Sequence, residues 1–234
     1  MSLAQSVRLI HETVNKTLHN SPLKDRPVTI LAASKGQSQE HIIQAIASGI
    51  GDFGENRVQE AEAKWPPLRK TYPQVRLHLI GPLQTNKVKK ALGLFDVIQT
   101  IDRPKLAEVL SAELRALSKE KSQHSALKTQ HFFIQVNIGK EPQKAGAMPD
   151  EVDALIEYCR SLHLPVVGLM CIPPSQHPPA PYFALLREMA RRNGLAELSM
   201  GMSEDYETAV RMGATCIRLG RVLFGERDVT DMSN

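Results

Sequence analysis

The chain has 234 residues, which suits one large domain, and α/β barrels commonly have about this length. Hydrophobic residues make up 42% and charged residues 23%, so the composition argues against a fibrous or largely disordered protein. The formal net charge is a mild +4, and aromatic residues reach only 5%, which offers little for stacking on single-stranded nucleic acid.

Basic residues gather in two stretches, and neither stretch interleaves aromatic side chains. The two clusters are Lys87, Lys89 and Lys90, and Lys119, Lys121 and Lys128. We interpret both as solvated helix faces and a loop, and we expect no nucleic-acid partner.

The three cysteines, Cys159, Cys171 and Cys216, are odd in number and widely spaced. No CxxC pair or zinc-type spacing occurs, so the sequence predicts neither a disulfide scaffold nor a metal site. We expect each cysteine to be a small buried hydrophobe in a reducing compartment.

The first predicted element is an N-terminal helix over about residues 2–20. Its apolar residues, Leu3, Val7, Ile10, Val14 and Leu18, recur at helical spacing. The stripe predicts a helix packed on the domain, with an amphipathic targeting helix as the alternative. The segment lacks the apolar centre of a secretory signal, and no run of about 18 apolar residues occurs. We therefore expect a cytoplasmic protein with no membrane contact.

After this helix, apolar runs of strand length alternate with longer helical patterns. Strands are predicted at residues 28–34, 52–56, 75–81, 96–101, 132–138, 166–172, 198–201 and 216–219. Helices are predicted from residue 42 to 49 and at 58–69, 86–94, 104–117, 149–162, 182–192 and 204–212. Pro66-Pro67 is expected to interrupt the second of these helices, and residues 118–130 and 175–181 are expected to be loops.

Strands that alternate with helices indicate a parallel sheet, whose closed form is the (β/α)8 TIM-type barrel. The sequence therefore predicts one barrel domain over residues 1–234, with the added N-terminal helix and a short C-terminal tail at about 226–234. A doubly wound open sheet is the alternative, because counting strands does not establish closure. No GxxxxGK[ST] or GxGxxG motif opens the first helix, which weakens the nucleotide-binding versions of that alternative.

The C-terminal ends of barrel strands carry the chemistry in this fold class. Lys35 follows the nearly apolar strand VTILAAS, so its side chain can enter a partly desolvated pocket. Desolvation lowers the pKa of a lysine, and the neutral amine is the form that attacks an aldehyde. A solvated lysine just past a strand is the more common alternative.

The predicted ends of the seventh and eighth strands hold small residues: Ser199, Gly201, Ser203 and Gly220. Barrels often bind phosphate at the loops after these two strands. The glycines permit close backbone approach, and the serines supply hydroxyl donors. Tight-turn chemistry explains the same glycines equally well, so the residues alone leave both interpretations open.

Several long motifs occur in a familiar order from about Val28 to Asp228. They are AASKG, FGENRVQEA, LHLIGPLQTNKVKK, TIDR, IQVNIGKEPQKAG, GLMCIPP, LSMGMSEDYETAV and IRLGRVLFGERD. Together they resemble the pyridoxal phosphate homeostasis protein family, whose pyridoxal 5′-phosphate (PLP) binding proteins are related to the barrel domain of alanine racemase.

The resemblance implies that Lys35 holds PLP as a Schiff base and that Asn56 faces the cofactor ring. It also implies that Arg218 faces the pyridine nitrogen, where a protonated arginine would keep that nitrogen unprotonated and the ring a weaker electron sink. With the strand-end residues added, the candidate cofactor site comprises Lys35, Asn56, Met170, Ser199, Gly201, Ser203, Arg218, Gly220 and Arg221.

Arg221 departs from the family pattern, which often has a small hydroxyl residue after the glycine. Its side chain could add a charge-assisted phosphate contact, or could point away and leave the backbone amide to bind.

The function implied by the resemblance is a non-catalytic PLP-binding protein in intracellular PLP homeostasis, with PLP-dependent apoenzymes as candidate recipients. We expect a monomer, because no obvious exposed apolar stripe of the sequence is left unassigned. The alternatives are a PLP-dependent racemase of the alanine racemase type and a barrel that binds only a phosphorylated metabolite. The racemases carry a further C-terminal β domain that supplies a catalytic tyrosine, and this sequence ends at Asn234. Tyr206, near the strand-seven loop, is expected to serve packing instead.

Overall fold

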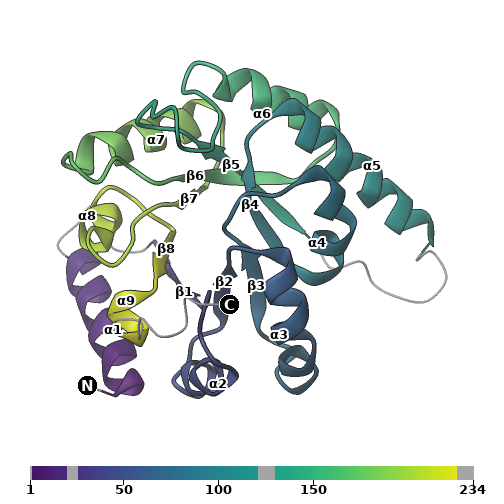
Figure 1. Ribbon diagram of the computed structural model, residues 1–234. Helices are drawn as coiled ribbons and strands as arrows, with labels where there is room; N and C mark the ends of the chain where they lie inside the picture. The colour runs from purple at the N-terminus through teal and green to yellow at the C-terminus, as the bar shows by residue number, and fades with distance from the viewer. Residues whose placement is uncertain (1, 20–25, 121–129, 226–234) are drawn as a thin grey trace.

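The computed structural model describes residues 2–19, 26–120 and 130–225. Eight parallel strands pair in chain order, and the eighth pairs with the first to close a barrel. Figure 1 shows the strands at the centre of the molecule and the helices around them. The closed strand order confirms the predicted TIM-type barrel, and the alternative prediction of an open doubly wound sheet is wrong.

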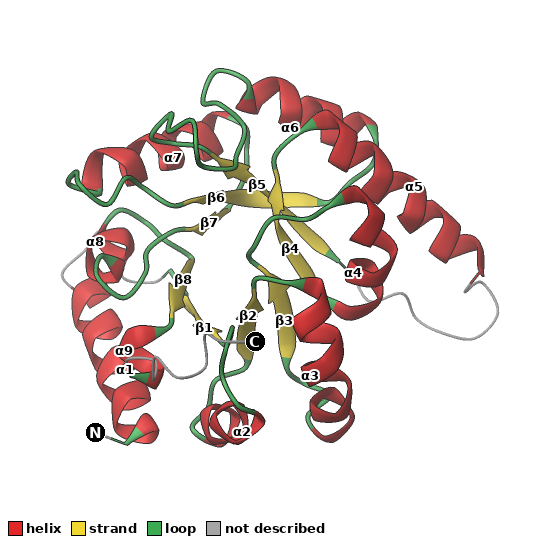
Figure 2. Ribbon diagram, viewed as in Figure 1, coloured by secondary structure: helices red, strands yellow, loops and turns green. Residues whose placement is uncertain are grey.

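The strands, seen in yellow in Figure 2, are β1 Thr29–Ala33, β2 Asp52–Glu55, β3 Arg76–Leu79, β4 Val97–Ile101, β5 His131–Val136, β6 Val166–Cys171, β7 Glu197–Ser199 and β8 Cys216–Leu219. The helices are α1 Leu3–His19, α2 Gln39–Ala47, α3 Val58–Thr71, α4 Val88–Leu94, α5 Pro104–Glu120, α6 Val152–Ser161, α7 Ala180–Arg192, α8 Tyr206–Arg211 and α9 Arg221–Phe224. A short 3-10 turn, Thr85–Lys87, precedes α4.

The N-terminal helix is confirmed as α1, and its apolar stripe is the buried face. Val7, Ile10, Val14 and Leu18 are buried there. The helix packs on α8, α9 and α2, and Figure 1 shows it in purple beside the yellow C-terminal helices. The first element of the chain therefore covers helices that follow the last two strands. Within the described residues, no helix has the length and apolar character needed to cross a membrane.

Helix α3 differs from its prediction because it runs unbroken through Pro66 and Pro67. The two prolines remove backbone donors, which disfavours a helix interior. However, Trp65 is fully buried beside them, and Leu68 is 4% exposed. Burial of these side chains against the barrel outweighs the local preference for a break.

Other boundaries shift where the sequence patterns are weakest. Helix α5 continues to Glu120, so the predicted loop 118–130 starts later, and residues 121–129 lie outside the described residues, as does the predicted tail 226–234. Strand β7 ends at Ser199, two residues before the prediction, and α8 begins at Tyr206 instead of residue 204. The four-residue helix α9 was not predicted.

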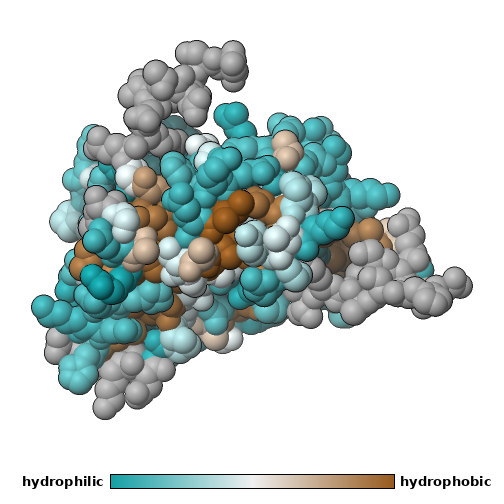
Figure 3. Space-filling view, turned by 90° about the horizontal axis from the view of Figure 1, so that it is seen from below, coloured by the Kyte–Doolittle hydropathy of each residue, from teal (hydrophilic) through white to brown (hydrophobic). Residues whose placement is uncertain are grey.

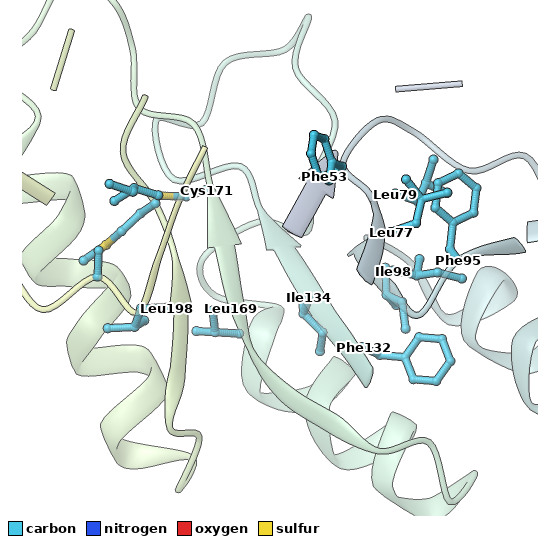
Figure 4. Close-up of a cluster of buried hydrophobic side chains, with 14 of the residues drawn as sticks. Phe53, Leu77, Leu79, Phe95, Ile98, Phe132, Ile134, Leu169, Cys171 and Leu198 are labelled. Carbon is cyan, nitrogen blue, oxygen red and sulfur yellow. The ribbon is translucent and has the colours of Figure 1, made fainter. Parts of the chain in front are cut away.

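The main apolar core lies between the strands and the surrounding helices. Figure 4 shows part of it, with side chains such as Phe53, Leu77 and Phe132. On β2, Phe53 faces α3, and its ring centroid lies 5.2 Å from that of Trp65. Gly54 faces the opposite way, since a Cβ there would lie 2.5 Å from Leu31 Cδ2 inside the barrel. The alternation along β2 therefore separates an apolar outer layer from the barrel interior.

The cysteines confirm the expectation of small buried hydrophobes. Cys159, Cys171 and Cys216 are all free and buried. Burial raises the pKa of Cys159 and Cys171 to about 12, and that of Cys216 to about 11. These thiols therefore stay protonated at neutral pH and act as core residues.

The surface in Figure 3 shows hydrophobic side chains, in brown, set among hydrophilic ones. The large hydrophobic residues that are exposed in the described part of the chain are Leu9, Ile43, Tyr158, Leu185 and Met202. They belong to different elements of the fold: Leu9 to α1, Ile43 to α2, Tyr158 to α6, Leu185 to α7 and Met202 to the loop after β7.

Candidate functional site

A cavity of about 600 Å³ opens at the C-terminal ends of the strands. Its lining includes residues that follow four strands, namely Lys35 after β1, Asn56 after β2, Ile80 after β3 and Ile172 after β6. The side chain of Arg218, on β8, also reaches it. A cavity of this size at this end of a barrel is the usual place for a small-molecule site.

Lys35 lies in the turn that leaves β1 for α2. The Gln37 N–H donates to the Ser34 carbonyl at 3.0 Å, which closes the turn. Gly36 has a φ of +68°, a conformation that glycine adopts without strain. The turn leaves Lys35 half-buried on the wall of the cavity.

Arg218 points from β8 into the barrel and is 4% exposed. One guanidinium nitrogen, Nη1, donates to Ser199 Oγ at 2.8 Å, and the other, Nη2, donates to the Cys171 carbonyl at 2.8 Å. No ion pair in the described part of the chain includes Arg218. Burial lowers the pKa of its guanidinium, which nonetheless stays charged at neutral pH. The site therefore holds a buried positive charge at the cavity wall.

A chain of hydrogen bonds runs from Arg218 through the barrel interior. Ser199 Oγ donates to Gln99 Oε1 at 2.6 Å, and Gln99 Nε2 lies 3.0 Å from His78 Nδ1. His78 Nε2 lies 2.7 Å from Asp52 Oδ1. The Gln99 NH2 group can only donate, so His78 Nδ1 accepts from it, and His78 Nε2 donates to the Asp52 carboxylate, which accepts. His78 is then neutral, with its proton on Nε2, and burial lowers its pKa in agreement.

The chain matches the family described as Alanine racemase, N-terminal domain, over residues 23–228. It is 36% identical to the pyridoxal phosphate homeostasis protein of Aquifex aeolicus, over 97% of this chain and 99% of that protein. It is 34% identical to the protein of the same name from Pseudomonas aeruginosa, over 97% of this chain and 96% of that one. The chain belongs to the pyridoxal phosphate homeostasis protein family.

Solved structures agree with this membership of the homeostasis protein family. PipY of Synechococcus elongatus, solved with PLP bound, superposes with a TM-score of 0.78 at 32% identity, covering 96% of this chain and 100% of that one. The alanine racemase of Corynebacterium glutamicum superposes with a TM-score of 0.67 at 16% identity, covering 98% of this chain and 62% of that one. The racemase likeness shows the barrel fold alone.

Six of the nine candidate residues for this family's cofactor line the cavity, and three do not. The six are Lys35, Asn56, Ser203, Arg218, Gly220 and Arg221. Ser199 is buried behind Arg218 and supports its guanidinium. Met170 is also buried, and it packs with Val97 and Phe133 away from the cavity lining. Position at a strand end did not distinguish these two from residues that face the opening.

Gly201 and Gly220 need glycine for different reasons. Gly201 has a φ of +94°, and a Cβ there would lie 2.5 Å from the Ala209 Cβ and 3.1 Å from the Tyr206 Cα. Its lack of a side chain therefore serves the packing of α8. Gly220 borders the cavity, and the nearest atom to a Cβ there is Ala33 Cβ at 3.8 Å. Of the two glycines, only Gly220 borders the cavity with open space at the position of a Cβ.

The rim near β8 carries polar groups on two short segments. The Val222 N–H donates to Ser203 Oγ at 3.3 Å, which joins the loop after β7 to α9. The guanidinium of Arg221, the family departure, pairs with the Glu204 carboxylate, and both side chains are largely exposed. The Arg221 side chain is thus at the rim, where it has an acidic partner.

Several residues that line the cavity were not among the candidate site residues of the sequence analysis. Ile80, Ile172 and Met202 give the cavity apolar surface suited to a flat ring. Lys144 donates to the Pro173 carbonyl at 3.2 Å and pairs with Glu141 at 2.6 Å. The isoleucines directly follow strands, so the strand-end rule could have found them, whereas Lys144 lies on a long loop with no periodic signal. Within residues 2–19, 26–120 and 130–225, no group of acidic, histidine or cysteine side chains is arranged to hold a metal ion.

Replacing His78 with glutamine should reduce the pH dependence of stability. Glutamine can accept from Gln99 and donate to Asp52 without titrating. In the wild type the folded pKa of His78 lies below its ordinary value of 6.5, so the unfolded chain binds a proton first as the pH falls. Stability should then drop by up to about 1.4 kcal/mol per pH unit below pH 6.5. Urea unfolding from pH 7 to 5 should show a smaller drop for His78→Gln, and parallel curves would contradict a neutral His78.

The two glycines should respond differently to alanine. Gly201→Ala should lower the free energy of unfolding by at least about 2 kcal/mol, since it combines positive φ with a clash. Gly220→Ala should change it by no more than about 0.5 kcal/mol, because its φ is ordinary and the space is open. Urea titrations of both variants provide the measurement, and equal losses would mean that the packing of α8 is not what requires Gly201.

Proposed function

We propose that this chain binds PLP as a Schiff base on Lys35 and serves intracellular PLP homeostasis without catalysing a reaction. The observation that carries the proposal is that Lys35 and the buried Arg218 line one cavity at the C-terminal end of the barrel. The solved relative with PLP bound, 32% identical over nearly the whole chain, supports the choice of ligand.

The groups around the cavity suit the chemistry of PLP. PLP supplies an aldehyde, and a neutral lysine amine can bond to its carbon with loss of water. Arg218 offers a permanent donor for a ring nitrogen that carries no proton, and Asn56 offers an amide beside the ring. Gly220, Ser203 and Arg221 surround the part of the cavity that we assign to the phosphate.

The position of Arg218 also supports a function without carbanion chemistry. A ring nitrogen that accepts from a guanidinium stays unprotonated, so the ring draws electrons weakly. The hydrogen-bond chain to Asp52 holds the guanidinium in one orientation, and Ser199 contributes to the site through that contact. An arrangement of this kind favours storage of the cofactor over carbanion chemistry.

We further propose a monomer in the cytoplasm whose partners are PLP and PLP-dependent apoenzymes. In the described part of the chain only five large hydrophobic side chains are exposed, and they come from five different segments, which supports the monomer. In the basic cluster near α4, Lys90 pairs with Glu62 of α3 at 3.0 Å, so part of its charge is already balanced. A nucleic-acid partner is therefore not part of the proposal.

Borohydride reduction of the PLP-loaded protein should leave a pyridoxyl group on Lys35, because only a Schiff base is reduced to a stable amine. Lys35→Ala should abolish the absorbance of the Schiff base and the label, while the fold stays intact. Lys144→Ala, which changes the other lysine on the cavity wall, is the matched control and should keep both. Peptide mapping reads the site directly, and a label on any other lysine would contradict the proposal.

The protein should also show no appreciable racemase activity. Racemisation needs an acid–base group on each face of the substrate, and Lys35 can serve only one. Tyr206 packs against the core at the start of α8 and is not part of the cavity lining. Incubation with L-alanine in deuterated water should show no turnover near about one per second. Turnover at that rate that vanishes in Lys35→Ala would favour the racemase alternative instead.

A further inference from the structure

Three charged residues lie directly behind Lys35, on the side away from the cavity. Glu55 ends β2, while Glu60 and Lys64 belong to α3. Lys64 Nζ lies 2.8 Å from Glu55 Oε1 and 3.0 Å from Glu60 Oε1, and it donates to the Ser34 carbonyl at 2.9 Å. An ammonium group has three donors, so these three contacts use all of them.

Ser34, the residue before Lys35, is held at each of its polar groups. Its N–H donates to the Gly54 carbonyl at 2.9 Å, and its hydroxyl donates to Glu55 Oε1 at 2.7 Å. Its carbonyl accepts from the Gln37 N–H at 3.0 Å as well as from Lys64. The backbone that enters the Lys35 turn therefore has a defined position.

Gly36, the residue after Lys35, is held by the same cluster. Its N–H donates to Glu60 Oε1 at 2.7 Å. Although partial burial opposes the shift, this bond and the Lys64 ammonium lower the pKa of Glu60, so the acceptor is charged at neutral pH. Both neighbours of Lys35 are therefore bound by one ion cluster, while the Lys35 side chain is left on the cavity wall.

Burial of these charged groups costs desolvation free energy, so the cluster is a poor means of stabilising the fold. The Glu55 side chain has no exposed area, and that of Lys64 is 10% exposed. Burial raises the pKa of Glu55, and Lys64 opposes that rise. Buried ion pairs of this kind are often no more stable than apolar residues of similar volume. Their use here, on both sides of one lysine, suggests a geometric role.

We propose that Glu60 and Lys64, with Glu55, are positioning residues for Lys35. They hold the Ser34–Gly36 backbone so that the Lys35 amine faces the bound aldehyde at a fixed orientation. This inference rests on the proposed Schiff base at Lys35, and it assigns a role to residues of α3 that do not line the cavity.

The test compares two ligands that differ at one group. PLP carries the aldehyde, and 4-deoxypyridoxine 5′-phosphate carries a methyl group in its place, so it cannot bond to Lys35. Glu60→Ala removes the acceptor for the Gly36 N–H, whereas Glu60→Gln retains an oxygen that can accept it. Glu62→Ala is the matched control, because Glu62 is on the same helix and pairs with the exposed Lys90.

Calorimetric titration of each variant should separate the ligands. Glu60→Ala should weaken PLP binding by about tenfold, the size of one lost charge-assisted hydrogen bond, and should leave the deoxy analogue unchanged. Glu60→Gln should retain most of the PLP affinity, and Glu62→Ala should bind both ligands like the wild type. Lys64→Met should behave like Glu60→Ala if it folds, and the Glu60 variants decide the matter if it does not.

The failure of this inference is distinguishable from failure of the proposed function. Borohydride label on a lysine other than Lys35 in the wild type would overturn both. Label on Lys35 with unchanged PLP binding in Glu60→Ala would overturn the positioning role only. Equal losses of PLP and of the deoxy analogue, or equal losses in Glu60→Ala and Glu60→Gln, would also overturn it.

Discussion

The pairing of β8 with β1 is the constraint on which the site depends. It closes the barrel and sets Arg218 beside Leu31 in register, with Leu219 beside Ala32. The chain then leaves β1 at Lys35 and β8 at Gly220, so both ends reach the same cavity. Without closure these segments, which lie at opposite ends of the sequence, would be on opposite edges of a sheet. The added helix α1 packs over the helices that follow the last strands and covers this part of the barrel.

Two polar networks use the two faces of the strands. Inside the barrel, the chain from Arg218 to Asp52 connects a buried cation to a carboxylate through three neutral side chains. Each group in it has a partner, which is what makes burial of the guanidinium tolerable. Outside the barrel, the cluster around Lys64 joins β1, β2 and α3. Strand β2 supplies both networks, because side chains alternate across a strand and Asp52 and Glu55 are three residues apart: Asp52 serves the interior and Glu55 the helix side.

Each network holds one group of the cavity wall in place, namely Arg218 and the turn that carries Lys35. The hydrogen-bond chain inside the barrel orients the Arg218 guanidinium. The Lys64 cluster outside the barrel holds Ser34 and Gly36, the two neighbours of Lys35. The apolar residues Ile80, Ile172 and Met202 line the same cavity. A cavity that joins the Lys35 amine to a fixed guanidinium suits an anionic aldehyde cofactor such as PLP.

The sequence by itself determined the order of the elements, the barrel class, the N-terminal helix and the family, since these follow from local periodicity and from long motifs around Lys35 and Arg218. It also identified the lining residues Lys35, Asn56, Ser203, Arg218 and Arg221, because strand ends are readable from apolar runs, but it did not single out polar lining residues on the longer loops such as Lys144 and His177. Only the tertiary structure decided that Met170 packs in the interior, that Gly201 serves α8 and that α3 passes through two prolines. The cluster of Glu55, Glu60 and Lys64 was likewise beyond the sequence analysis. Each of these outcomes depends on contacts between side chains from different elements, and neither periodicity nor spacing records which residues a side chain will meet after the chain has folded.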